Sequence, residues 1–259
     1  MLDLTFSLTE LELFLLVIVR VTCFIMVAPF FGMNDTPNMV KIGIGVLIST
    51  LIYQTIDKGS LEYNTVLGYA IIVMKEAVTG LIIGYSAAIC TSILNFAGQL
   101  VDTEIGLSMV SLFDPVSNDS VTISGTYYNY TVTLMLLISG LYQYVLSALC
   151  ESFNLIPING AVFSSEKLLT SMITFLGDYL SLGFRLCLPV FCSMLLLNGI
   201  LGILAKVSPQ LNMFAVGIQL KILLGLTVMF LTVSMLPTAS SLILSEVKKS
   251  MTMFMEAML

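Results

Sequence analysis

A polar stretch at residues 99–120 separates two long runs that carry no charge, residues 77–101 and 120–150. Each run is long enough to cross a bilayer as a helix, since roughly 20 apolar residues span the hydrocarbon core. The stretch itself holds four of the chain's 16 aspartates and glutamates, yet residues 107–113 are mainly apolar. Irregular backbone at membrane depth is tolerated only where protein buries it or where it lines a water-filled cavity. The stretch is therefore either a connector on one membrane face or a loop folded back into a pore.

The composition places the chain among integral membrane proteins. Of its 259 residues, 58% are hydrophobic and 10% are charged, whereas soluble domains carry about 25% charged residues. The net charge of −6 argues against nucleic acid as a partner, because nucleic-acid binding needs a basic face. The acidic N-terminus has none of the lysines or arginines of a signal peptide, so we expect no cleavable signal.

The absence of histidine excludes much catalytic chemistry. No Ser-His triad, Cys-His pair or His-ligated metal site can be built from this chain. The five cysteines are scattered through apolar segments, as expected for small packing residues. We therefore predict no catalytic residue, no cofactor and no metal site.

Apolar segments alternate with polar breaks along the whole chain, which predicts an all-α fold. The apolar segments are expected at residues 11–31, 39–56, 66–101, 120–150, 168–205 and 222–245. The acidic N-terminus and the basic C-terminus favour opposite sides of the membrane, whereas about six spans would return both ends to one side. Either one apolar run does not cross, or some helices form hairpins inside a protein assembly.

Charged and polar residues interrupt these segments, and contact between such side chains and lipid would be unfavourable. An arginine at the centre of a membrane helix costs roughly 2.5–3.5 kcal/mol on insertion scales. We therefore predict that these residues are buried charges or contacts with other subunits. The predicted set is Arg20, Lys75, Glu76, Asp102, Asp178, Arg185, Lys206, Pro209, Gln210, Asn212 and Lys221.

The spacing of these charges restricts their pairing. Lys75 and Glu76 point about 100° apart on a helix, so each is expected to find a partner elsewhere or to lie in the membrane interface. Asp178 and Arg185, seven residues apart, fall on one helical face. Gly80 and Gly84 form a small-xxx-small pair that allows two membrane helices to approach closely.

Residue chemistry alone leaves two functions open. Broken segments at residues 106–115 and 209–212 fit an ion-coupled secondary transporter with half-helices meeting at the midplane, and they equally fit a subunit of a larger channel. An intramembrane aspartyl protease would need two aspartates sharing a proton in facing spans. Asp102 and Asp114 lie in the break and Asp178 has Arg185 near it, which argues against that enzyme.

A series of short motifs, in one order through most of the chain, resembles the FliR family of flagellar export-gate proteins, whose counterparts serve type III secretion injectisomes. The motifs are Arg20 with Ala28-Pro29-Phe30-Phe31-Gly32, Pro37 with Lys41, Lys75-Glu76 with Gly80 and Gly84, Gly98-Gln99 with Asp102, Gly106-Leu107-Ser108 with Asp114-Pro115, Ser152-Phe153 with Pro157, and Pro209-Gln210 with Asn212 and Phe214. Lys206 departs from the arginine usual in the family, and Glu104 stands where glutamine is common.

The resemblance implies a non-enzymatic subunit of the type III export gate in the bacterial inner membrane, at the flagellar basal body. Family members assemble with P-type and Q-type gate proteins, an FlhB-type substrate-switch protein and an FlhA-type export receptor. The implied assembly is a cone of bent helical hairpins, raised in part above the lipid bilayer, and its substrates are unfolded flagellar proteins. By the same resemblance, residues 1–150 correspond to a P-type subunit and residues 151–259 to a Q-type subunit.

The resemblance also assigns the loop at residues 106–115 to a plug in the closed pore. Its residues are Gly106, Leu107, Ser108, Met109, Val110, Ser111, Leu112, Phe113, Asp114 and Pro115. Mixed apolar and small polar side chains suit a plug that must seal against ions and then withdraw. Gly106 gives the backbone freedom, and Asp114-Pro115 can restart a helix as its N-cap and first residue.

Overall fold

In the computed structural model, the described residues are 8–32, 36–56, 63, 65–108, 122–208, 210 and 212–259, and they form helices and no strand. The helices are α1 (Leu8–Val27), α2 (Asn38–Tyr53), α3 (Val66–Ile105), α5 (Ile123–Ile138), α6 (Leu141–Leu155), α7 (Ser165–Val207), α8 (Met213–Thr232), the 3₁₀ helix η1 (Val233–Met235) and α9 (Leu236–Glu256). The prediction of an all-α membrane protein is confirmed.

Three segments of the described chain are long and apolar enough to cross a membrane. They are α3, α7 and the segment Ala215–Glu256, which combines α8, η1 and α9. Helices α5 and α6 meet the same criteria only when they are taken together as one broken span.

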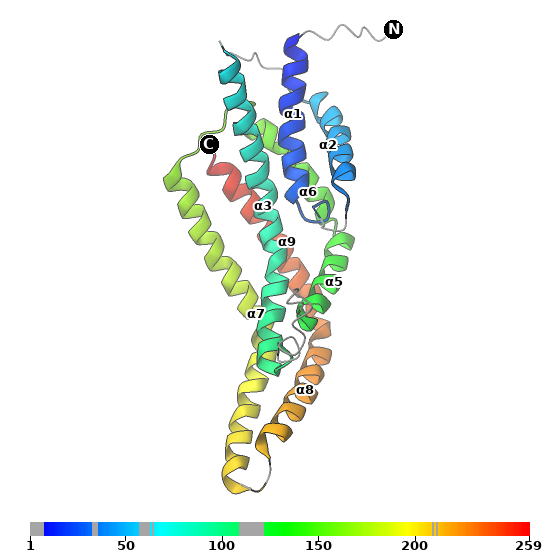
Figure 1. Ribbon diagram of the computed structural model, residues 1–259, viewed down its shortest axis with the longest axis vertical. Helices are drawn as coiled ribbons and strands as arrows, with labels where there is room; N and C mark the ends of the chain where they lie inside the picture. The colour runs from blue at the N-terminus through cyan, green and yellow to red at the C-terminus, as the bar shows by residue number, and fades with distance from the viewer. Residues whose placement is uncertain are drawn as a thin grey trace. The chain divides into compact units, whose positions relative to one another are not determined.

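The chain divides into two compact units, each built from segments distant in sequence. The first unit contains Met1–Cys90, Gly140–Phe175 and Ser245–Leu259. Within it, α1 lies beside α2 (Figure 1), with Thr22 of α1 against Gly45 of α2. Leu16, Phe24 and Ile25 of α1 are fully buried, so α1 is a core helix of this unit.

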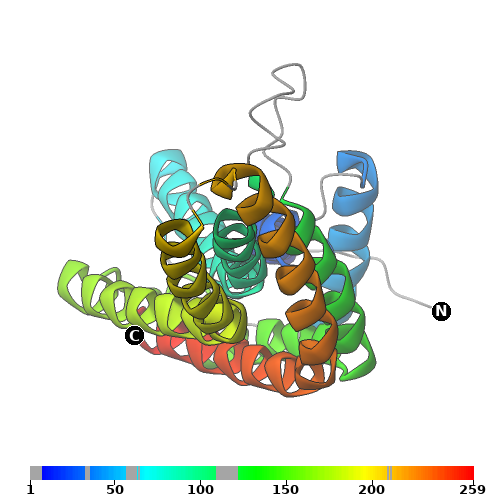
Figure 2. The ribbon, with the colours of Figure 1, turned by 90° about the horizontal axis from the view of Figure 1, so that it is seen from below.

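The second unit contains Thr91–Ser139 and Leu176–Leu244. The C-terminal part of α3 packs on α7 through Phe96, whose ring centroid lies 5.6 Å from that of Tyr179 and 6.1 Å from that of Phe184. Helices α7 and α8 run side by side in both views (Figures 1 and 2). Asn212 precedes α8 as its N-cap, and its side-chain oxygen accepts a hydrogen bond from the Ala215 N–H at 3.4 Å. This is the N-cap arrangement expected of asparagine.

The sequence does not show where one helix breaks and another continues. The segment predicted at 120–150 is broken at Ser139-Gly140, where Gly140 has φ 77°, a left-handed conformation that glycine adopts without steric cost. Conversely, Pro189 does not end α7, which continues to Val207. The proline lacks an N–H and so leaves the Arg185 carbonyl without its helical donor, but the turns on both sides maintain the helix.

Each of the two compact units includes residues from both sides of position 150. Compactness is set by packing between distant helices, which a linear division of the sequence does not describe. The correspondence of residues 1–150 and 151–259 to P-type and Q-type subunits stays a prediction.

Candidate functional site

A buried ion pair joins α1 to α3 in the first unit. The Arg20 Nε donates to Glu76 Oε2 at 2.5 Å, and both side chains are fully buried. Burying two charges is favourable only if the geometry is good and their other polar atoms find partners. Glu76 therefore pairs with Arg20 and not with its chain neighbour Lys75.

The remaining polar atoms of this pair fasten two further segments. Arg20 Nη1 donates to the carbonyl of Ile156 at 2.9 Å and to that of Ser152 at 3.3 Å, at the end of α6. Its guanidinium carbon lies 4.3 Å from the ring centroid of Phe153, within the range of a cation–π contact. Arg20 Nη2 has no hydrogen-bond partner among the described residues.

Glu76 holds a tight turn with its second oxygen. Its Oε1 accepts from the backbone N–H of Asn159 at 2.8 Å. The turn is closed by the Gly160 N–H donating to the Pro157 carbonyl at 2.8 Å, and Asn159 has φ 66°. Asparagine tolerates this left-handed conformation better than most residues. Lys75 lies on the outer side of the same turn, with its Nζ 3.4 Å from Asn159 Oδ1.

Glycines on α3 bring the ion pair into range. A β-carbon at Gly80 would collide with the carbonyl oxygen of Arg20, and one at Gly84 would lie 2.7 Å from that of Phe24. The two helices therefore approach at backbone distance, as the small-xxx-small spacing predicts. This contact places Arg20 and Glu76 opposite one another.

In the second unit, Asp102 caps a helix that lies beyond the predicted plug. Asp102 is 2% exposed, and both of its carboxylate oxygens lie 3.2 Å from the Ser124 N–H, which donates to them. Ser124 is in the first turn of α5, whose first amide groups have no acceptor within the helix. A negative charge at a helix N-terminus is also favourable to the helix dipole.

A close helix contact supports this cap. A β-carbon on Gly98 of α3 would overlap the backbone of Gly125 of α5, so the two backbones are in direct contact. The Ser124 hydroxyl lies 3.4 Å from the sulfur of Met229 on α8. Together these contacts fasten the end of α3 to the start of α5, on either side of residues 109–121.

The predicted plug begins where α3 ends. Gly106 has φ 90° and its N–H donates to the Asp102 carbonyl at 3.0 Å, which closes the last turn of α3. Leu107 and Ser108 follow and are half-buried. The other predicted plug residues, Met109, Val110, Ser111, Leu112, Phe113, Asp114 and Pro115, lie outside the described residues.

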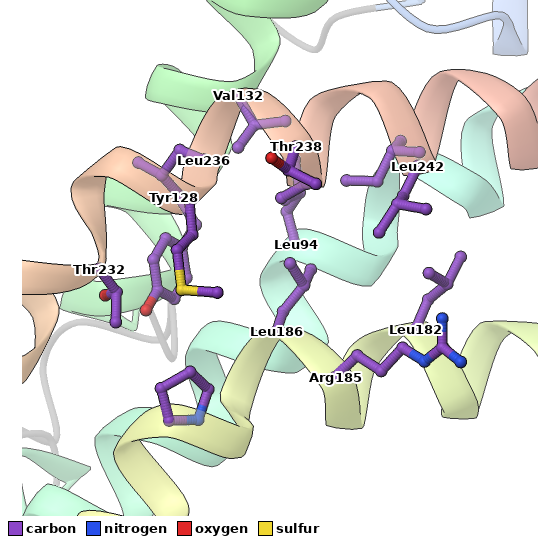
Figure 3. A pocket seen from close by; sticks show the side chains of 14 residues that line it. Leu94, Tyr128, Val132, Leu182, Arg185, Leu186, Thr232, Leu236, Thr238 and Leu242 are labelled. Carbon is purple, nitrogen blue, oxygen red and sulfur yellow. The ribbon is translucent and has the colours of Figure 1, made fainter.

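A cavity of about 160 Å³ lies in the second unit beside Arg185. We call it the Arg185 cavity. It is lined mainly by apolar side chains from α3, α5, α7 and α9, and Arg185 is the charged residue in its lining. Figure 3 shows the Arg185 side chain extending along α7 toward Leu182, with Leu242 of α9 across the cavity. Arg185 is exposed, and no hydrogen bond or ion pair to its side chain is found within the described part of the chain.

The other predicted polar residues do not form a common site. Asp178 is half-buried on α7, the helix that also carries Arg185. Lys206, Gln210 and Asn212 are exposed around the turn between α7 and α8, and Lys221 is half-buried on α8. Pro209 lies outside the described residues.

Residue type does not reveal two partners of the buried carboxylates. They are Asn159, which pairs with Glu76, and Ser124, which pairs with Asp102. In both cases the contributing group is the backbone N–H, which every residue other than proline possesses. Residue type therefore cannot reveal it.

Within the residues described, no group of three or more cysteine, aspartate and glutamate side chains has the geometry of a metal site. The arrangement holds helices together through buried charges, and the long apolar helices define an integral membrane protein of the all-α class.

The family model described as bacterial export proteins, family 1, matches residues 11–247. The chain belongs to this family. It is 30% identical to the flagellar biosynthetic protein FliR of Bacillus subtilis (strain 168) over 227 residues, which is 86% of each chain. It is 25% identical to FliR of Escherichia coli (strain K12) over 223 residues, covering 86% of this chain and 84% of that one. The surface presentation of antigens protein SpaR of Shigella flexneri is 24% identical over 206 residues, 78% of each chain.

Removing one member of the buried pair leaves the other charge without compensation. We expect Glu76→Ala to destabilise the protein by about 3–5 kcal/mol, whereas replacing both Arg20 and Glu76 with methionine is expected to cost less than the single change. The measurement is the temperature at which half of the tagged chain is lost from heated, detergent-solubilised membranes. Glu151→Ala, at an exposed carboxylate of α6, is the control and should leave this temperature unchanged. A double variant less stable than Glu76→Ala would contradict the uncompensated-charge explanation.

Changes at Asp102, which caps α5, are expected to lower stability less than Glu76→Ala does, and by an amount that depends on the substituted residue. Asp102→Ala removes the acceptor and should cost about 0.5–2 kcal/mol, the usual range for a lost N-cap. Asp102→Asn keeps one acceptor oxygen and should lower the stability less. Thr103→Ala, at an exposed neighbour, should change the stability little. The same heating assay ranks the three variants. Equal losses for alanine and asparagine at position 102 would show that the hydrogen bond to Ser124 is not what the carboxylate contributes.

Proposed function

We propose that this protein is a non-enzymatic subunit of the type III export gate of the bacterial flagellum. The observation that carries the proposal is the family match over residues 11–247, together with FliR relatives similar over more than four fifths of both chains. In this role the protein forms part of a channel for unfolded flagellar proteins in the inner membrane, at the flagellar basal body.

The helix lengths support an assembly that extends beyond the lipid. Helix α3 has 40 residues and α7 has 43, and at 1.5 Å per residue each runs for about 60 Å. The hydrocarbon core is about 30 Å thick. Part of each helix therefore lies outside the core, which fits helices that are covered by neighbouring subunits.

The exposed apolar side chains and cations of the long helices support the presence of partner subunits. Large apolar side chains such as Leu196 and Phe230 are 72% and 77% exposed. Cations on α7 lie among such side chains, and a cation in hydrocarbon is unfavourable. We propose that P-type, Q-type and FlhB-type membrane proteins cover this surface and that an FlhA-type receptor delivers substrates. In that assembly, residues 1–150 take a P-type position and residues 151–259 a Q-type position.

The loop at residues 106–115 is proposed to plug the closed channel. The residues that precede the loop support this proposal, because Gly106 ends α3 and Asp102 fastens that end to α5. An apolar constriction excludes ions by dewetting, and leucine and methionine contacts are adaptable enough to part for a polypeptide.

The assembly proposal predicts that the chain is unstable by itself. Expressed alone, the tagged protein should be degraded or aggregated, and co-expression with P-type, Q-type and FlhB-type proteins should yield a monodisperse complex on size-exclusion chromatography. A secondary transporter, the alternative function, is expected to fold alone. Purification of a stable and monodisperse chain without partners would therefore favour the transporter.

The plug proposal predicts ion leakage without loss of assembly. Deleting Gly106 to Phe113 should leave the co-expressed complex intact but increase membrane conductance to small ions. A complex carrying Lys167→Ala, at an exposed residue of the first turn of α7, is the control and should stay ion-tight. If the deleted complex assembles and remains ion-tight, the stretch is a connector.

A further inference from the structure

The Arg185 cavity combines two features of a protein-docking surface. Its volume of about 160 Å³ is close to that of an engineered apolar cavity of about 150 Å³ that binds benzene. A space of that size accepts one aromatic or branched aliphatic side chain. Filled pockets of this kind are the usual centres of binding energy in protein interfaces.

The charge of Arg185, beside the cavity, is the second feature, and it restricts the chemistry of a docking partner. Among the residues described, the Arg185 side chain has no hydrogen-bond or ion-pair partner, and the lining of its cavity includes no aspartate or glutamate. The guanidinium group pairs best with a carboxylate, which can accept two parallel hydrogen bonds from it. A carboxylate on a docking partner would therefore complement the charge of Arg185.

The surface around Arg185 is apolar and exposed. Phe184 and Leu188 on the same helix are 53% and 50% exposed. They lie next to Arg185 in sequence and one turn beyond it, so whatever pairs with Arg185 must also cover apolar surface. An apolar helix with one carboxylate meets both conditions.

We propose that the Arg185 cavity receives a membrane helix of another gate subunit. One large apolar side chain of that helix fills the cavity, and an aspartate or glutamate three or four residues away pairs with Arg185. That spacing places two side chains on one helix face about 5–6 Å apart. The inference rests on the proposed function, because it requires a multi-subunit membrane assembly.

A phospholipid is the competing occupant, with a phosphate on Arg185 and an acyl chain in the cavity. The cavity has room for a short part of such a chain, whereas one side chain fills it. The two occupants are separated by the chemistry of what is captured, so the test is a site-specific crosslink in the assembled complex.

The experiment places a photoreactive amino acid at Leu242, across the cavity from Arg185, in the complex co-expressed with P-type, Q-type and FlhB-type proteins. Irradiation is expected to join this chain to one of these subunits, on a helix with a carboxylate three or four residues from the crosslinked position. A photoreactive residue at Leu169, exposed near the start of α7, is the positional control and should not capture that helix.

Charge exchange then tests the role of Arg185. Arg185→Glu should lower recovery of the captured subunit about tenfold or more, which corresponds to the loss of one buried charge pair. Replacing the partner's carboxylate by arginine in the same complex should restore recovery. Lys167→Glu, the same charge reversal at the first turn of α7, should leave recovery unchanged.

The outcomes separate this inference from the proposed function. If the complex assembles but Leu242 captures phospholipid, or only this chain itself, the docked helix is wrong and the gate assignment stands. Failure of the exchanged charges to restore recovery also overturns the pairing with Arg185. If the wild-type chain forms no complex with these proteins, the proposed function fails and the inference fails with it.

Discussion

The buried pair between Arg20 and Glu76 is the interaction on which the first unit depends. Two charges from α1 and α3 are satisfied by each other, by the carbonyls at the end of α6 and by the backbone of the turn at Asn159. In a low-dielectric interior these contacts are strong, but either charge alone would be costly. The pair therefore fixes four segments in one arrangement, and each needs the others to be in place.

Close backbone contact makes both buried polar sites possible. In the first unit, Gly80 allows α3 to reach α1 at Arg20, and in the second unit, Gly98 allows α3 to reach α5 at Gly125. Membrane helices gain little from the hydrophobic effect against one another, so small residues and hydrogen bonds supply much of their specificity. The same helix uses this device twice, once beside Glu76 and once beside Asp102.

Much of this organisation could be predicted from the sequence. Apolar runs located the long helices, and the cost of a charge in lipid singled out Arg20, Glu76 and Asp102, which the structure places in the interior. Two features could not be predicted from the sequence, namely the partners of the buried carboxylates and the positions of helix breaks. The partners of the two carboxylates are backbone N–H groups, which leave no mark in residue type. Whether a helix breaks depends on local energies too small to rank by composition, since Gly140 ends one helix and Pro189 does not end another.

The function depends on which helices face lipid and which face protein. The long apolar helices of this chain carry cations, and an unpaired cation is unfavourable both in lipid and in a protein interior. Family membership supports a protein export assembly as the source of the pairing groups. A structure of the co-expressed complex by electron cryomicroscopy tests this most directly. We expect P-type or Q-type helices to cover α7, and residues 106–115 to lie across the axis of a closed channel. A complex in which α7 faces lipid and these residues lie on a membrane surface away from the channel would contradict it.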